Sequence, residues 1–105
     1  PDPNLRLLTP LTGETAVLGE PITFMGTVQH GGTNRFQLQA RSAGTEEPFQ
    51  TIAQRRGDLN LGRIGLWETT ESVAGLYDVR LIPVDNGGVR LESASCTIQI
   101  ELISP

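Results

Sequence analysis

The sequence has few of the residues on which catalytic and metal sites depend. It contains one cysteine, Cys96, which can form no disulfide within the chain and no cysteine-based metal cluster. Its one histidine, His30, would have to serve alone in any catalytic triad or histidine metal site. Carboxylates such as Glu46 and Glu47 lie in turn-like segments, without the apolar surroundings that raise a pKa for acid–base work. We therefore predict that the protein is not an enzyme and needs no metal or other cofactor.

Positive charge and long apolar runs are scarce as well. Lysine is absent, and 8 arginines stand against 12 acidic residues, which gives a net charge of −4. Binding to nucleic acid or to an anionic membrane surface requires concentrated positive charge, so we expect neither partner. No stretch reaches the length of a membrane span, and we expect no membrane insertion.

The length of 105 residues suits one hydrophobic core, and we expect a single domain over residues 1–105. The 12 glycines and 7 prolines predict frequent turns. Proline with a small polar or acidic neighbour stands at both ends, at Pro1-Asp2 and Ser104-Pro105, which is typical of linkers. We therefore expect the domain to be a module excised from a longer protein.

The stretch from Ser72 to Gly88 carries the strongest structural signal. Residues 76–82 alternate in polarity and predict a β-strand. The Asn-Gly and Gly-Gly pairs within residues 85–88 suit the positive φ angles of tight turns and predict a hairpin. Tyr77 follows a glycine at the start of the strand, as in the tyrosine corner of Greek-key sandwiches. Pro83 fits a central strand poorly, and a bulge or an early end to pairing would accommodate it.

Alternation predicts the other strands. Residues 22–29, 35–41 and 93–103 alternate between apolar and polar side chains, with Cys96 on the inner face of the last segment. Shorter strands are expected at 5–8 (an edge strand between prolines), 16–18, 49–53, 61–67 (with a bulge at Gly62 or Gly65) and 89–91. Residues 42–48 and 54–60 are expected to form loops, and no window has a helical period. The sequence predicts an all-β, immunoglobulin-like, two-sheet antiparallel sandwich of about seven strands with Greek-key connections.

The same motifs resemble a known family. Residues 9–28, with Pro21-Ile22-Thr23-Phe24-Met25-Gly26 at their centre, are similar to the start of many bacterial immunoglobulin-like modules. Residues 61–69 and 74–87, which include Leu66-Trp67-Glu68-Thr69 and Gly75-Leu76-Tyr77, resemble immunoglobulin-like or fibronectin-III-like accessory domains of secreted and envelope-attached bacterial proteins, some of them penicillin-binding proteins. Those domains often have a cysteine in the last strand, where Cys96 stands here. The resemblance covers most of the chain, departs from the pattern at Pro83 and at residues 54–60, and implies a fold and an extracellular or cell-envelope location rather than an activity.

One candidate interaction surface is the outward row of the strand at 35–41. The row consists of Arg35, Gln37, Gln39 and Arg41, and Arg80 is expected on the same sheet face. Sandwiches that bind glycans usually present exposed aromatic platforms, and this row has none, so we expect no glycan partner. A solvated sheet face is the favoured interpretation.

The loops offer weaker candidates. The tripeptide Arg56-Gly57-Asp58 resembles an integrin-binding motif, although an ordinary solvated loop explains it as well. Oxygen ligands for Ca²⁺ could come from residues 85–86 with Glu20 or Glu92, but the spacing of a calcium loop is absent and a hairpin turn accounts for residues 85–88.

These observations favour a non-catalytic extracellular accessory module that acts as a spacer, a stabilising domain or a protein-interaction domain. Its expected partners are neighbouring domains of the parent chain or another envelope protein. The alternative is a ligand-binding or adhesion module that uses the loops at residues 30–34, 54–63 and 85–90.

Overall fold

The structure is a computed structural model that describes residues 5–29, 35–57, 59–69, 73–85, 87–91 and 95–105. The described residues form eight strands and no helix. The strands are β1 (Leu5–Thr9), β2 (Thr15–Val17), β3 (Ile22–Val28), β4 (Arg35–Ser42), β5 (Gln50–Arg56), β6 (Leu59–Trp67), β7 (Gly75–Val84) and β8 (Cys96–Ile103). Among these residues no helix is long and apolar enough to cross a membrane.

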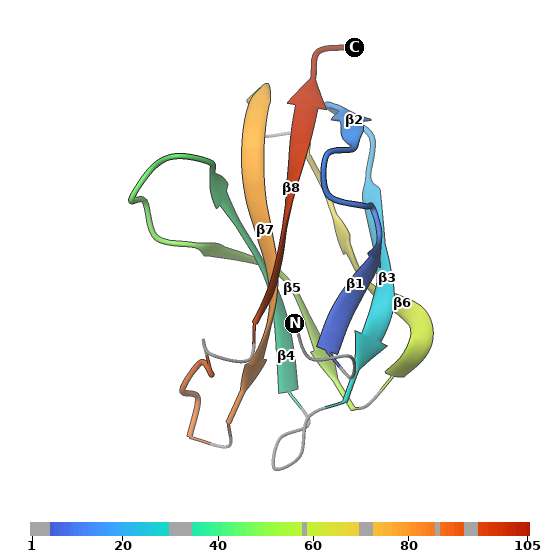
Figure 1. Cartoon of the computed structure of the whole chain (residues 1–105), viewed down its shortest axis with the longest axis vertical. Coiled ribbons are helices and arrows are strands. Elements are labelled where there is room, and N and C mark those ends of the chain that lie inside the picture. Colours follow the sequence, from blue (N-terminus) through green and yellow to red (C-terminus); the bar gives the residue numbers. More distant parts are fainter. Residues whose placement is uncertain (1–4, 30–34, 58, 70–72, 86, 92–94) are drawn as a thin grey trace.

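The strands form two sheets that face each other (Figure 1). One sheet has the order β1-β3-β6 and the other the order β2-β8-β7-β4-β5. The chain passes from one sheet to the other at every connection except β4–β5 and β7–β8, so strands distant in sequence become neighbours. The predicted all-β, immunoglobulin-like sandwich is thus confirmed. Pairing is antiparallel apart from β2, which runs parallel to β8, and β1 is an edge strand as its flanking prolines predict.

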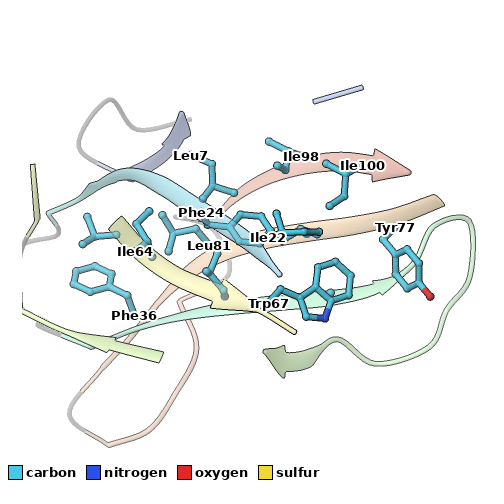
Figure 2. Close-up of a cluster of buried hydrophobic side chains, with 14 of the residues drawn as sticks. Leu7, Ile22, Phe24, Phe36, Ile64, Trp67, Tyr77, Leu81, Ile98 and Ile100 are labelled. Atoms are coloured by element: carbon cyan, nitrogen blue, oxygen red, sulfur yellow. The ribbon is translucent and has the colours of Figure 1, made fainter. Parts of the chain in front are cut away.

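The core lies between the sheets and follows the predicted alternation (Figure 2). In β8 every second residue is buried, from Cys96 to Leu102, which confirms the prediction of Cys96 as an inward thiol. Phe24 of β3 and Phe36 of β4 are almost completely buried, and burial of each such side chain contributes on the order of 2 kcal/mol. Because aromatic residues are few, leucine, isoleucine and valine supply most of the remaining core.

Tyr77 forms the predicted tyrosine corner at the start of β7. Its hydroxyl donates a hydrogen bond of 2.8 Å to the carbonyl of Val73, four residues upstream. Its ring packs edge-on against Trp67 of β6, with ring centroids 5.4 Å apart and an interplanar angle of 80°. Both rings are largely buried. Trp67 and Tyr77, which belong to the motifs that resemble the family, are therefore packing residues, as expected.

Pro83 lies inside β7 without a bulge in its pairing with β4. The β4–β7 register runs without a shift from Tyr77 to Val84, with Pro83 opposite Phe36. The Pro83 carbonyl accepts a hydrogen bond from Leu91 N, on the side away from β4. N–H and C=O of one residue in an antiparallel strand point to the same side, so the missing Pro83 N–H removes no bond to β4. Pairing with β8 has already ended at Leu81, and this early end is one of the two predicted solutions.

The secondary structure predicted for two segments is wrong. Residues 54–60 are largely strand rather than loop, because Gln54 to Arg56 extend β5 along β4 and β6 begins at Leu59. Polar side chains are compatible with this edge strand, one face of which meets solvent. Conversely, the strand expected at residues 89–91 is a single antiparallel bridge between Val84 and Arg90, and the described residues between β7 and β8 form no further strand.

The expected bulge in β6 is confirmed. The β3–β6 register shifts between Phe24 and Met25 and again between Gly26 and Val28. Leu61, within the second irregularity, has a φ of 52°, and its N–H donates to the Thr27 hydroxyl at 3.2 Å. This bond holds an exposed leucine in a backbone conformation that L-residues rarely adopt.

Candidate functional site

The outer face of the five-stranded sheet brings the predicted polar row together. Gln39 of β4 lies opposite Arg80 of β7, and Arg41 lies opposite Asp78. The Arg41 Nε lies 3.9 Å from the Asp78 carboxylate, whose other oxygen accepts a bond of 3.1 Å from the Gln99 amide. Strand pairing thus places groups from β4, β7 and β8 on one surface, as expected from their alternation.

The expectation that this face is simply solvated is wrong at Gln39, whose side chain is 0% exposed. Its carbonyl oxygen accepts a bond of 2.7 Å from Arg80 Nε, and its amide donates to the Gln37 carbonyl oxygen at 2.9 Å. A buried amide is stable only when its polar atoms are paired, and both ends of Gln39 are. The predicted row is therefore partly an internal hydrogen-bond network.

Phe49 covers this network, and the sequence did not predict that position. The guanidinium carbons of Arg41 and Arg80 lie 4.2 Å and 4.0 Å from the centre of its ring, within the range of cation–π interactions. The row therefore does carry an aromatic side chain, contrary to expectation. The available signal was a lone phenylalanine at the end of a polar loop, in the sequence Glu46-Glu47-Pro48-Phe49, where no core strand required it.

A hollow of about 360 Å³ lies beside the Phe49 ring. Arg90 also reaches it, and its Nε donates to the Gln37 carbonyl oxygen at 3.2 Å. The lining residues are Arg41, Glu46, Glu47, Pro48, Phe49, Arg80 and Arg90. We call this the guanidinium hollow. It combines three cations, two acids and an aromatic ring, and it can offer several hydrogen-bond donors to an anionic group.

A second hollow, of about 270 Å³, lies around the same β4–β5 connection and shares Arg41, Glu47 and Pro48 with the first. Ile52, Trp67 and Tyr77 contribute apolar surface to it. The two hollows together flank the connection between β4 and β5.

The tripeptide at residues 56–58 lies where β5 turns into β6. Arg56 ends β5 and is exposed, and Gly57 has a φ of 85°, whereas Asp58 is outside the described residues. Arg35 lies opposite both Arg56 and Val84, so the start of β4 and the ends of β5 and β7 lie at the same end of the sheet. Residues 30–34, which include His30, are likewise outside the described part.

Asp85 serves the turn after β7. Its carboxylate accepts hydrogen bonds of 2.9 Å from the N–H groups of Gly87 and Val89, and Gly88 has a φ of 84°. This arrangement is the turn that the glycine pairs predict, and the antiparallel bridge between Val84 and Arg90 closes it. Within the described residues, no cluster of three or more histidine, cysteine, aspartate or glutamate side chains is placed to hold a metal ion.

Comparison with known proteins adds information on the fold. No model of a protein family matches the sequence, and no curated protein matches it either. Among solved structures, the chain is similar to a fibronectin(III)-like module of CbhA from Clostridium thermocellum, with a TM-score of 0.64, 15% identity, and coverage of 94% of this chain and 95% of that one. Murine CRIg also aligns, with a TM-score of 0.45, 16% identity, and coverage of 94% and 96%. The sheet order, the tyrosine corner and the end-to-end match with the CbhA module show that this chain has an immunoglobulin-like, fibronectin-III-like fold.

Proposed function

We propose that this domain is a non-catalytic module of a larger extracellular or cell-envelope protein, in which it spaces, stabilises or contacts neighbouring domains. The observation that carries the proposal is the alignment with the CbhA module, which spans 94% of this chain and 95% of that one. A match over whole domains supports a modular unit, whereas function on a shared fold has to be argued from sites.

The use of the polar residues supports the same conclusion. The Tyr77 hydroxyl, the Asp85 carboxylate and the Gln39 amide each form hydrogen bonds that hold strands or turns in place. Thr69, which is fully buried, accepts from Gly19 N at 3.0 Å and donates to the Glu20 carbonyl at 3.1 Å. The hydrogen bonds of these polar groups stabilise the fold, and the groups are not arranged around a reacting atom.

The proposal is tested first by sequencing the gene on both sides of this segment and then by deleting the segment from the parent protein. We expect an export signal and further domains to be encoded beside this segment, and an in-frame deletion of the segment to leave the catalytic activity of a neighbouring domain intact while lowering its thermal stability or its release from the cell. The proposal would be contradicted by a gene that encodes this domain alone without an export signal. Equally contrary would be substrate turnover by the isolated chain.

A second candidate is adhesion through the end of the sheet at which β5 and β7 finish and β4 begins, because the paired residues Arg35, Arg56 and Val84 lie together there. In this case the immobilised Arg56→Ala chain would retain fewer integrin-bearing cells than the wild-type chain. Arg6→Ala, which removes the same charge from β1, is the matched control. Equal retention by all three chains would exclude the tripeptide as an adhesion site.

A further inference from the structure

We propose that the guanidinium hollow binds the carboxylate of an extended peptide segment of a partner protein. The proposal goes beyond the role of a spacer, which needs no such site, and it does not depend on the identity of the parent protein. It rests on the contacts that position three arginines, on the mixed charge around them and on the adjacent edge strand.

Each of the three arginines contacts a residue of the sheet, although Arg90 is itself exposed to solvent. Arg80 is fixed by its bond to the fully buried Gln39, and Arg90 by its bond to Gln37. Arg41 is positioned by Asp78 and by a bond of 3.5 Å from its Nη1 to the Glu47 carbonyl. Because these contacts already restrict the long side chains, an incoming anion would lose less conformational entropy in ordering them.

The guanidinium groups are close enough to repel one another. Arg41 and Arg80 lie 4.2 Å and 4.0 Å from the same ring centre, so their guanidinium carbons are no more than about 8 Å apart, roughly one Debye length at physiological ionic strength. Arg90 lines the same hollow. A carboxylate placed there would reduce this repulsion and accept charge-assisted hydrogen bonds.

The acids at the hollow select among anions. Glu46 and Glu47 also line it and are exposed. These two charges disfavour a dense polyanion, whose many charges would meet them, but they tolerate a single carboxylate flanked by neutral groups. A neutral sugar is disfavoured for another reason: the Phe49 ring on which it would stack already contacts two guanidinium groups.

The neighbouring strand favours a polypeptide as the source of the carboxylate. Phe49 immediately precedes β5, which is an edge strand of the five-stranded sheet, and Gln50 and Thr51 at its start are exposed. The backbone groups on the outer side of an edge strand can pair with an added extended segment. A glutamate on such a segment would enter the guanidinium hollow, while its apolar neighbours would contact Phe49 and Pro48.

The test uses the ¹⁵N-labelled 105-residue chain and a short peptide with one central glutamate between valines, compared with its glutamine twin. We expect the glutamate peptide to shift the Nε–H resonances of Arg41, Arg80 and Arg90 in a saturable way. The glutamine twin should bind about tenfold or more weakly, because it loses charge-assisted bonds. Arg90→Gln and Arg41→Gln should each weaken binding of the glutamate peptide by a similar factor, whereas Arg6→Gln, on β1 of the other sheet, should not.

Several results would overturn the proposal. Equal affinity for the two peptides would show that the carboxylate is not recognised. Unchanged binding by both Arg90→Gln and Arg41→Gln would place the binding site elsewhere. A site that takes polyglucuronate or inorganic phosphate more tightly than the glutamate peptide would be a polyanion or free-anion site instead.

Discussion

Replacement of Gln39 by methionine tests whether the buried network stabilises the fold. The two side chains have similar length and volume, so the substitution leaves no large cavity. It removes the bond from Arg80 Nε, a charged donor, and the bond to Gln37. The first is worth about 1.5–3 kcal/mol and the second about 0.5–1.5 kcal/mol, and burial of the apolar methionine returns part of this loss.

We therefore expect the Gln39→Met chain to lose about 1–3 kcal/mol of unfolding free energy, which lowers Tm by about 5–20 °C in a domain of this size. Urea unfolding followed by the fluorescence of Trp67, the single tryptophan, provides the measurement, because that side chain is buried against Tyr77. Gln99→Met is the matched control: Gln99 is exposed, and its loss should change stability by no more than about 0.5 kcal/mol.

A double-mutant cycle sharpens the result. If the Gln39–Arg80 bond matters, the effects of Gln39→Met and Arg80→Met will be non-additive by about 1 kcal/mol, because the second substitution finds the bond already broken. A Gln39→Met chain as stable as the Gln99→Met control would refute the reasoning. Additive effects in the cycle would show that the two side chains act independently.

Three further substitutions can be measured with the same unfolding assay. Gly26→Ala places a methyl group against the Arg6 carbonyl oxygen in the β1–β3 pair and should cost about 3 kcal/mol, whereas a loss below about 1 kcal/mol would mean that β1 moves freely. Tyr77→Phe removes the corner bond and should cost about 1–2 kcal/mol, and an unchanged midpoint would argue against a stabilising corner. Leu61→Gly relieves a positive φ at an exposed side chain and should leave stability unchanged or raise it by up to about 1 kcal/mol, so a clear loss would show that the leucine side chain contributes to packing.

The sequence predicts this fold well where one face of a strand is buried. Period-two alternation correctly identifies the inner residues of β8 and the inner thiol of Cys96, because burial on one side selects apolar residues at every second position. Tyr77 is predicted for a similar reason, since its corner depends on a hydrogen bond to a residue only four positions away. Local patterns are sufficient where the deciding contacts are local or repeat along a strand.

Alternation fails where a distant segment covers the outer face. Gln39 has the position of a solvated residue in β4, yet it is buried because Arg80 and Phe49 arrive from β7 and from the segment before β5. Neither contact produces a periodic pattern of residues in the sequence. The same limitation explains residues 54–56, whose polar composition indicates a loop although pairing with β4 makes them strand.

The parallel pair of β2 and β8 gives the domain a distinctive response to tension. Thr15 to Val17 lie beside Glu101 to Ile103, and further backbone bonds join Gly13 to Gln99 at 2.7 Å and Leu18 to Ile103 at 2.9 Å. A pull on the chain before β2 and after β8 draws two parallel strands in opposite directions along their length, so it loads these bonds together in shear rather than opening them one at a time. The rate at which a domain ruptures under force is set by the height of its unfolding barrier. Once β1 has separated from β3, tension between the segment before β2 and the segment after β8 would thus be carried across the sheet without first peeling β8 from the fold.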